Sequence, residues 1–261
     1  MKLDGKIAVI TGAAGGIGRA LARRFAAEGA AGLVLSDLDP DAVAKLATEL
    51  DAHPVAADVT DEAQVKALVD AALERYGRVD LFCSNAGILS GAGIEAPNEI
   101  WQRSWAVNVQ AHVYAARAVL PSMLARGEGY LLQTCSAAGL LTAVGDAPYS
   151  VTKHAAVGLA EWLAIEYGGR GIKVSALCPQ GVDTPMLNDG LDLGHVGARV
   201  TAASGAVLSP EDVAGAAVRG LAEERFLILP HPEVATYQAN KVGDPDRWIA
   251  GMRRLAAGLS G

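Results

Sequence analysis

Short runs of apolar, often β-branched residues alternate along the chain with longer segments whose apolar positions recur every three or four residues. The short runs predict strands, and the longer segments predict amphipathic helices. The strand candidates are almost continuously apolar, which is typical of strands buried on both faces. The predicted strands cover residues 6–11, 33–36, 54–57, 79–83, 130–134, 173–177 and 226–229, and the predicted helices cover 16–28, 39–50, 62–76, 101–125 and 149–167.

This alternation of elements indicates the fold class. Short strands separated by helices of ten or more residues are typical of right-handed βαβ units, which build a parallel sheet. Neither an internal repeat nor a linker divides the chain. The sequence therefore predicts a single α/β domain over residues 1–261, with a Rossmann-like, doubly wound parallel sheet of about seven strands and helices on both faces.

Residues 186–208 depart from the alternation, because four glycines are mixed there with Leu, Val and Ala. The segment follows a predicted strand end, and ligands of open α/β sheets bind outside the carboxyl ends of the strands. We therefore expect either a substrate lid or a mobile surface loop at this place.

Composition and charge exclude several classes of protein. The 261 residues are 51% hydrophobic and 20% charged, which favours a full core and disfavours a disordered chain. The net charge of −7 offers no basic surface to a nucleic acid. No run of about 18 apolar residues occurs, and the first residues lack the apolar stretch of a signal peptide. We expect a cytoplasmic protein that binds neither nucleic acid nor membrane.

Metal chemistry and hydrolysis are also disfavoured. The three cysteines lie far apart without a CxxC pair, and the five histidines show no metal-ligand spacing. A Ser-His-Asp hydrolase is conceivable on a parallel sheet, but the sequence contains no G-x-S-x-G motif. We therefore predict no metal site.

A glycine-rich turn, TGAAGGIG over residues 11–18, joins the first predicted strand to the first predicted helix. Glycines let the backbone approach a pyrophosphate, which the helix N-terminus attracts. Asp37 follows Gly18 by 19 residues and ends the second strand, where a carboxylate accepts hydrogen bonds from an adenosine ribose. Asp37 is alternatively a helix N-cap, a role that Asp39 can also fill. The pattern predicts dinucleotide binding.

Asp37 also bears on the choice between NAD and NADP, because a carboxylate repels a 2′-phosphate. No basic side chain stands beside it, since position 14 is Ala and position 38 is Leu. Arg19 is close in sequence, but we expect it inside the first turn of the helix. The sequence therefore predicts NAD (NAD+/NADH) rather than NADP.

Tyr149 and Lys153 are four residues apart in a predicted helix, which places their Cβ atoms on one face about 5–6 Å apart. A phenol has a pKa near 10 and needs a fall of about 2–3 units to act as a base near neutrality. The lysine and a positively charged nicotinamide can supply that fall. The same spacing is common for a surface lysine beside a half-buried tyrosine, so the pair alone does not define a site.

Three further motifs share the chain with this pair. They are Asn-Ala-Gly at residues 85–87, Asn108 in a long predicted helix, and Ser136 thirteen residues before Tyr149. Together, TGxxxGIG, NAG and Ser-x12-Tyr-x3-Lys resemble the short-chain dehydrogenase/reductase family over about residues 2–218. The resemblance implies an NAD(P)-binding Rossmann-fold catalytic domain that transfers a hydride.

The resemblance also implies four catalytic residues. Tyr149 would be the general base for alcohol oxidation and the general acid for ketone reduction, and Lys153 would lower its pKa and hold the nicotinamide ribose. Ser136 would stabilise the substrate oxygen. Asn108 would order a water that links Lys153 to solvent, or is otherwise a mid-helix Asn of poor helix propensity.

A cofactor cleft follows from the same resemblance. Asp58 and Val59 would receive the adenine ring, although Asp58 alternatively caps the helix that starts near Asp61. Val182 and Thr184 would bind the nicotinamide carboxamide. The expected cofactor-binding residues are Gly12, Gly16, Ile17, Gly18, Asp37, Asp58, Val59, Asn85, Gly87, Tyr149, Lys153, Val182 and Thr184.

One position departs from the family pattern Pro-Gly-x-Val-x-Thr, because Gln180 stands in place of its glycine. Its amide either contacts a polar group of the substrate or satisfies the local backbone. The presumed site is otherwise apolar and lacks an arginine for a carboxylate, which favours a neutral, fairly hydrophobic secondary alcohol or its ketone. Arg199 keeps an anionic substrate open. The expected substrate-binding residues are Ser136, Ala138, Tyr149, Gln180 and Met186.

Two alternatives remain open. A 3-oxoacyl thioester reductase of the same fold is disfavoured by Asp37, because reductive biosynthesis commonly uses NADPH. A non-catalytic nucleotide-binding sensor or scaffold is disfavoured by the complete catalytic set.

By resemblance we also expect a homo-oligomer, a tetramer or a dimer, built on helices near residues 104–125 and 149–167. The candidate contacts, which are equally able to pack on the sheet, are Trp105, Tyr114, Leu120, Trp162 and Leu163.

Overall fold

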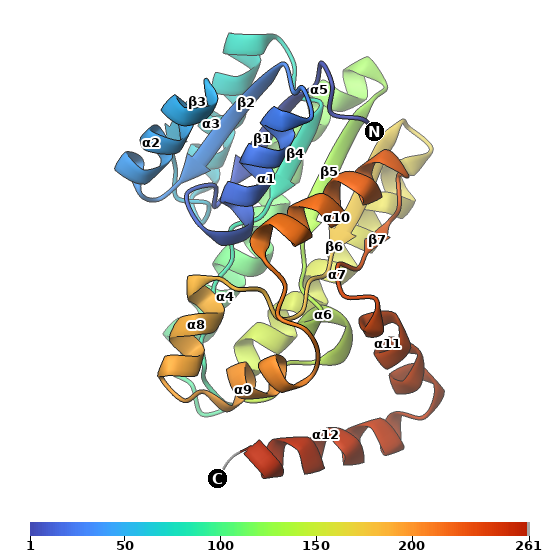
Figure 1. Cartoon of the computed structure of the whole chain (residues 1–261). Helices are drawn as coiled ribbons and strands as arrows, with labels where there is room; N and C mark the ends of the chain where they lie inside the picture. The colour runs from blue at the N-terminus through green and yellow to red at the C-terminus, as the bar shows by residue number, and fades with distance from the viewer. Residues whose placement is uncertain (260–261) are drawn as a thin grey trace.

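The computed structural model describes residues 1–259 and contains one parallel sheet in the order β3-β2-β1-β4-β5-β6-β7 (Figure 1). The chain winds outward from β1 to β3 and then returns to β4 on the other side of β1. This switch point opens a crevice at the carboxyl ends of β1 and β4. The strands are β1 (Ile7–Thr11), β2 (Gly32–Asp37), β3 (His53–Ala56), β4 (Leu81–Ser84), β5 (Gly129–Thr134), β6 (Ile172–Leu177) and β7 (Leu227–Ile228).

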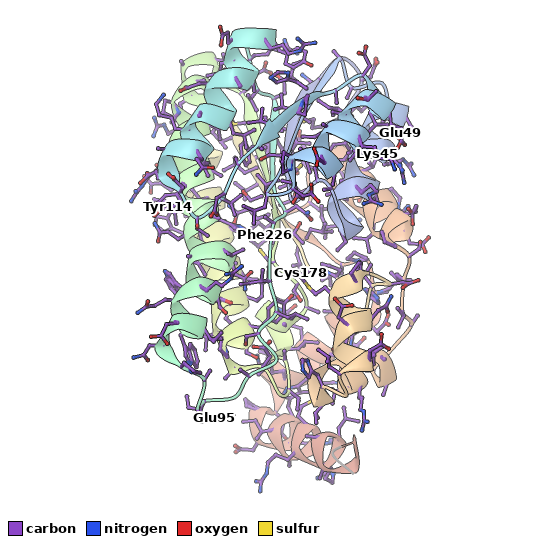
Figure 2. All side chains as sticks on the ribbon, turned by 90° about the vertical axis from the view of Figure 1, so that its left-hand side faces the viewer. Lys45, Glu49, Glu95, Tyr114, Cys178 and Phe226 are labelled. Carbon is purple, nitrogen blue, oxygen red and sulfur yellow. The ribbon has the colours of Figure 1, made fainter. Side chains whose placement is uncertain are left out.

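Helices cover both faces of the sheet, which explains why the strands are apolar along their whole length. Alternate residues of a strand enter opposite cores: Val9 packs beneath α3, α5 and α7, whereas Ile10 packs beneath α1, α2 and α10. Cys178 and Phe226 lie between the layers, while Glu49 of α2 lies on the outside (Figure 2). The covering helices are α1 (Gly16–Ala27), α2 (Pro40–Leu50) and α10 (Pro210–Ala222) on one face, and α3 (Glu62–Tyr76), α5 (Ala111–Arg126) and α7 (Ala147–Gly168) on the other.

The predicted helix over residues 101–125 is wrong in one respect, because it is not continuous. The segment begins as α4 (Asn98–Trp105), passes through a π-helical turn η1 (Ala106–Gln110) and continues as α5. Asn108 occupies the middle of the π turn and is fully buried. Such turns often mark functional sites, and sequence periodicity does not reveal them.

Residues 186–208, predicted as a lid or a loop, form two short helices, α8 (Pro185–Asp192) and α9 (Val196–Ala203). They lie beyond the carboxyl ends of the strands together with α6 (Ala138–Leu141), and the chain ends there with α11 (Glu233–Gly243) and α12 (Pro245–Leu259) (Figure 1). Among the described residues, no helix has the length and apolar character needed to cross a membrane.

Candidate active site

A single cavity of about 1480 Å³ extends from Asp37 at the end of β2 to α8, α9, α11 and α12. Pockets for one small molecule are commonly about 300–1,000 Å³, so this cavity has room for a dinucleotide and a second ligand together. It follows the crevice at the carboxyl ends of the strands, where the fold predicts a ligand.

The glycine-rich turn lines one end of the cavity. Gly12 has φ +63°, and a Cβ there would lie 2.9 Å from the Cα of Ala86. A Cβ on Gly16 would lie 3.0 Å from Thr184, and one on Gly18 would overlap the carbonyl oxygen of Gly12. No side chain caps α1, and its first turn contains no acidic residue. The turn therefore suits the close approach of an anionic group such as a pyrophosphate.

Asp37 lies in the cavity wall at the adenosine end. Its Oδ2 accepts a hydrogen bond from the backbone N–H of Ala14 at 2.9 Å, and Asp39 rather than Asp37 caps α2. Arg19 lies in the first turn of α1, as expected, but its side chain bends back to the carbonyl of Ala14 at 2.9 Å and also lines the cavity. A basic group therefore does stand at this end of the site.

Asp58 and Val59 line the same end of the cavity. The carboxylate of Asp58 accepts hydrogen bonds from the N–H of Thr60 at 2.9 Å and from its hydroxyl at 2.8 Å. The alternative role of Asp58 as a helix cap is wrong, because Asp61 caps α3.

Asn85 and Gly87 follow β4, the strand between β1 and β5, and both line the cavity. The amide of Asn85 donates to the carbonyl of Thr11 at 3.1 Å and accepts from the hydroxyl of Thr134 at 3.1 Å, so it ties the two strands together through β4. A Cβ on Gly87 would lie 3.3 Å from Lys153 Nζ. The glycine thus leaves space beside the lysine.

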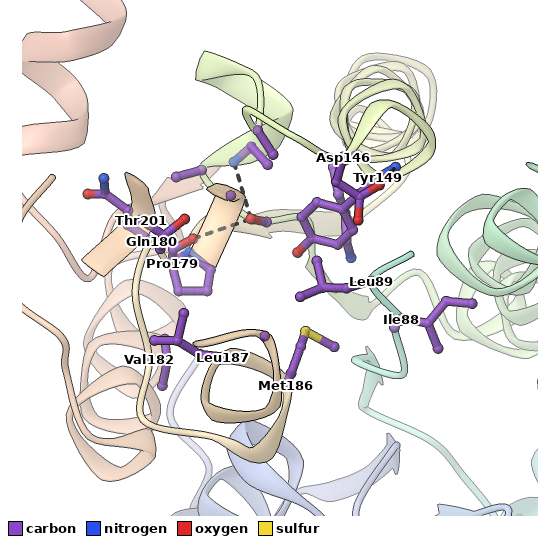
Figure 3. A pocket seen from close by; sticks show the side chains of 18 of the residues that line it. Ile88, Leu89, Asp146, Tyr149, Pro179, Gln180, Val182, Met186, Leu187 and Thr201 are labelled. Carbon is purple, nitrogen blue, oxygen red and sulfur yellow. Dashed lines mark hydrogen bonds between the residues drawn. The ribbon is translucent and has the colours of Figure 1, made fainter. Parts of the chain in front are cut away.

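Tyr149 and Lys153 lie on one face of α7, as their spacing predicts, with Lys153 Nζ 5.5 Å from the centre of the Tyr149 ring. The ammonium donates to the carbonyl of Thr134 at 2.9 Å. Ser136 follows β5 with φ +80°, a conformation rare for a residue with a side chain. Tyr149 projects into the cavity toward Leu89 (Figure 3).

Asn108 connects the cavity wall to α7, the helix that carries Tyr149 and Lys153. Its Oδ1 accepts from the N–H of Ile88 at 2.9 Å, and its Nδ2 donates to the Ile88 carbonyl at 3.0 Å and to Thr152 Oγ1 at 3.1 Å. Because these contacts engage its side chain, a water beside Asn108 would have to bind the main chain of the π turn.

The surroundings of Tyr149 in the protein alone shift its pKa upward. Burial raises the pKa, the hydrogen bond with Ser136 lowers it and the negative charge of Asp146 raises it, which together give a pKa of about 12. Burial also lowers the pKa of Lys153. The fall expected from the lysine and a bound nicotinamide is not present in the protein by itself, because an apolar setting disfavours the phenolate more than its neighbours favour it.

The expected substrate residues divide into two groups. Met186 of α8 is 40% exposed and lies near Leu89, on the side of the cavity toward which Tyr149 points (Figure 3). Ala138 opens α6 and also lines the cavity. The side chain of Gln180 lies on the Thr201 side of the cavity, away from Tyr149, and its Oε1 is buried without a partner among the described residues.

Sequence reasoning missed several residues of the wall. Asp146 is the N-cap of α7, and its position ahead of Ala-Pro was a readable helix-start signal. His231 accepts from the N–H of Gln180 at 3.1 Å and holds the loop after β6. The C-terminal helices contribute without any motif that would reveal them, through Tyr237, Asn240, Arg247, Trp248, Met252, Arg254 and Leu255.

The fold and this arrangement of glycine turn, tyrosine, lysine and serine define a dinucleotide-dependent oxidoreductase. The family model for short chain dehydrogenases matches residues 6–192, and the chain belongs to this family. The family resemblance, the fold class and the prediction of an oxidoreductase are thereby confirmed.

Named relatives and a solved structure agree with this family. The chain is 39% identical to a 1-deoxy-11-beta-hydroxypentalenate dehydrogenase of Streptomyces exfoliatus, covering 96% of this chain and 92% of the relative. It is 37% identical to a meso-2,3-butanediol dehydrogenase of Serratia marcescens, covering 72% and 76%. A short-chain dehydrogenase/reductase of Burkholderia phymatum, crystallised with NAD, is 33% identical with a TM-score of 0.86, covering 94% and 96%.

Proposed function

We propose that the protein transfers a hydride between NAD(H) and a neutral, fairly hydrophobic secondary alcohol or its ketone. The observation that carries this proposal is the meeting of two sites in one cavity. The glycine turn and Asp37 form one end, and Tyr149, Ser136 and Lys153 stand where the cavity opens toward an apolar compartment.

The residues of the chain divide the chemistry between them. NAD, when bound, supplies the hydride acceptor or donor. In alcohol oxidation, Tyr149 takes the hydroxyl proton while Ser136 donates a hydrogen bond to the substrate oxygen. Lys153 holds the ribose of the cofactor and, with the cationic nicotinamide, favours the phenolate that burial alone disfavours. In ketone reduction the same phenol returns the proton.

The remaining cofactor residues have assigned places in this proposal. Gly12, Gly16, Ile17 and Gly18 cradle the pyrophosphate, and Asp58 with Val59 contacts the adenine. Asn85, Gly87, Val182 and Thr184 hold the nicotinamide half.

Preference for NAD over NADP rests on the carboxylate of Asp37, which repels a 2′-phosphate. Arg19 acts against this preference, because its positively charged guanidinium lines the same end of the cavity. The ratio of kcat/KM for NAD to that for NADP tests the preference. We expect Asp37→Ala to reduce this ratio by about tenfold or more. A ratio near one in the unaltered protein contradicts the preference for NAD.

The substrate class follows from the compartment next to Tyr149, whose wall includes Leu89, Leu141, Val144, Met186 and Leu187. Burial of apolar substrate surface there stabilises the complex by roughly 25 cal/mol per Å². Both named relatives are dehydrogenases of hydroxylated compounds.

A second candidate substrate is an alcohol that also carries a carboxylate. The observation that favours it lies at the far end of the cavity, where Arg247 and Arg254 of α12 belong to the wall. The relative from Streptomyces exfoliatus is named for such an acid anion. A guanidinium can bind a carboxylate with two parallel hydrogen bonds.

The deciding experiment is the absorbance of NADH when the protein meets NAD and a panel of neutral and carboxylated secondary alcohols. We expect turnover that Tyr149→Phe abolishes, and a ranking that places bulky neutral alcohols first. A ranking led by carboxylated alcohols supports the second candidate. Turnover that survives in Tyr149→Phe overturns the proposed mechanism, and no turnover despite tight NAD binding favours a nucleotide-binding sensor.

We also propose that the protein is a cytoplasmic homo-oligomer, a tetramer or a dimer. Trp105 and Trp162 are about half exposed, whereas Leu120 and Leu163 are buried on the sheet and are not available to a partner. Tyr114 also packs against the core. Light scattering tests this proposal, and we expect Trp162→Glu to reduce the measured mass.

A further inference from the structure

Helices α8 and α9, the candidate lid, pack against two loops at positions occupied by glycine. A Cβ on Gly91 would lie 2.6 Å from the ring of His195, which precedes α9. A Cβ on Gly197 would overlap the carbonyl oxygen of Val144. The backbone of Gly197 therefore lies directly against the loop before α7, and the ring of His195 packs against the backbone of Gly91 in the loop after β4.

A single buried carboxylate joins these two loops. Asp146 is 6% exposed and caps α7, with Oδ1 accepting from the N–H of Tyr149 at 2.9 Å. The hydroxyl of Ser90 donates to the same oxygen at 2.6 Å. Oδ2 accepts from the backbone N–H groups of Ser90 at 2.8 Å and Gly91 at 2.7 Å. Four donors thus converge on one side chain, three from the loop after β4 and one from the first turn of α7.

This arrangement exceeds what a helix cap needs. The other aspartate caps, Asp39 and Asp61, are exposed and bond chiefly to the first turn of their own helices. Asp146 uses one bond for that purpose and three for a segment 55 residues away. A buried carboxylate with several N–H donors is costly to disturb, because its loss leaves those donors unsatisfied.

We propose that Asp146 is a positioning residue that holds the lid of α8 and α9 closed over the substrate compartment. It does so by fixing the loops at Ser90–Gly91 and Val144–Gly145, on which His195 and Gly197 rest. The consequence for turnover rests on the function proposed above. The consequence for the lid itself does not, because it concerns the protein without substrate.

The geometry assigns the effect to the substrate rather than the cofactor. Leu89, which precedes Ser90, and Met186 of α8 both line the cavity on the side toward which Tyr149 projects (Figure 3). Movement of either loop widens this compartment. At the cofactor end, a Cβ on Gly16 would lie 3.0 Å from Thr184, which precedes α8, whereas the carboxylate of Asp37 accepts a hydrogen bond from Ala14. We therefore expect KM for the alcohol to change much more than the Kd of NADH.

The first test substitutes the acceptor and keeps the cap. Asp146→Asn retains Oδ1 for the N–H of Tyr149, but its Nδ2 cannot accept from Ser90 and Gly91. Asp61→Asn is the matched control, since it makes the same change at an exposed cap of α3. We expect hydrogen exchange over residues 185–204 to accelerate about tenfold in Asp146→Asn and to stay unchanged in Asp61→Asn.

The second test leaves Asp146 intact and disturbs the contact of the lid. Gly197→Ala places a methyl group against the Val144 carbonyl, whereas Gly158→Ala places one in open space on α7. Both are helical glycines, so the intrinsic gain in helix propensity is shared. Faster exchange over residues 185–204 in the first variant alone supports the seating of the lid on this loop.

Kinetics complete the experiment. For Asp146→Asn we expect KM of a bulky alcohol to rise about tenfold while the Kd of NADH, measured by its fluorescence, changes less than about twofold. If hydrogen exchange over residues 185–204 is unchanged in a folded Asp146→Asn protein, the proposed role of Asp146 is overturned, whatever the activity. If exchange is accelerated in a protein without alcohol turnover, the role of Asp146 stands and the proposed function is rejected instead. An equal loss of NADH affinity also contradicts the proposal.

Discussion

The two ends of the cavity are built in different ways. At the cofactor end, the wall comes from short turns directly after β1, β2 and β4, where backbone geometry decides the fit. At the substrate end, the wall comes from α8, α9, α11 and α12, which follow the strands at greater distance along the chain and contact one another through side chains. Local turn geometry therefore defines the first end, and the packing of helices that are distant along the chain defines the second.

The largest expected effect concerns the boundary between the two ends. Tyr149→Phe removes the group that moves the proton and should reduce kcat by about 10²–10⁴-fold while weakening NADH binding much less than the loss of Lys153 does. Lys153→Met should reduce kcat and also weaken NADH, because Lys153 serves both ends. Stopped-flow absorbance and NADH fluorescence measure the two quantities. Equal losses of NADH affinity in both variants contradict this division.

The next effect breaks the cofactor end alone. Gly12→Ala forces a side chain onto a residue with φ +63° and brings its Cβ to 2.9 Å from the Ala86 backbone. We expect the Kd of NADH to rise about tenfold or more, as for the loss of roughly 1.4 kcal/mol. Gly77→Ala has a similar φ of +74° but open space around its Cβ, so it controls for backbone strain. A matching loss of affinity in Gly77→Ala contradicts the steric account.

A smaller effect concerns pH and the core beneath the cofactor end. His112 lies there beside Val59 and Ala86, and burial lowers its pKa to about 3. The unfolded chain gains a proton at His112 below its ordinary pKa of 6.5, whereas the folded protein does not until about pH 3. His112 therefore does not destabilise the folded protein above pH 6.5. As pH falls from 6.5 toward 3, protonation of His112 in the unfolded chain lowers the free energy of unfolding by at most about 1.4 kcal/mol per pH unit.

Thermal unfolding between pH 7 and pH 4 tests this prediction. His112→Phe removes the titrating group, so its Tm should fall less steeply with acid than that of the unaltered protein. His53→Gln, on β3 at the edge of the sheet, is the control. Parallel pH curves for His112→Phe and the unaltered protein contradict the assignment.

The smallest expected effect sharpens the description of the substrate end. Trp248 of α12 lines the cavity and packs near Tyr237, with ring centres 6.3 Å apart. Trp248→Ala should raise KM several-fold, by about 1 kcal/mol of lost contact, for a bulky alcohol. It should leave a small alcohol such as 2-propanol and the Kd of NADH unaffected. An equal change for both alcohols places Trp248 outside the substrate compartment.

The same contrast explains what the sequence could predict. The strands, the glycine turn and the Tyr149–Lys153 pair follow from local patterns, since each depends on residues close together along the chain. The π turn around Asn108 was not predictable, because it depends on contacts with Ile88 and Thr152. The raised pKa of Tyr149 depends on burial, which spacing does not report.

The substrate end shows the limit most clearly. The glycines indicate where the lid segment lies along the chain. They do not predict its two helices or its contacts with Gly91 and Val144. At the cofactor end, by contrast, the position of Arg19 in the first turn of its helix is predictable, and only the direction of its side chain toward the cavity requires the structure. The C-terminal helices carry no motif, so their part in the wall required the folded chain.

Helix α12 has a consequence for how this protein can change. Among its described side chains none is buried, although several line the cavity. Substitutions at exposed positions away from special contacts usually alter stability by no more than about 0.5 kcal/mol. Mutations at exposed positions of α12 that line the cavity, such as Arg247 and Arg254, can therefore accumulate almost neutrally for folding while they remodel what the enzyme accepts. This terminal helix is the part of the chain from which a new specificity can evolve, or be selected in a library, at the lowest risk to the sheet.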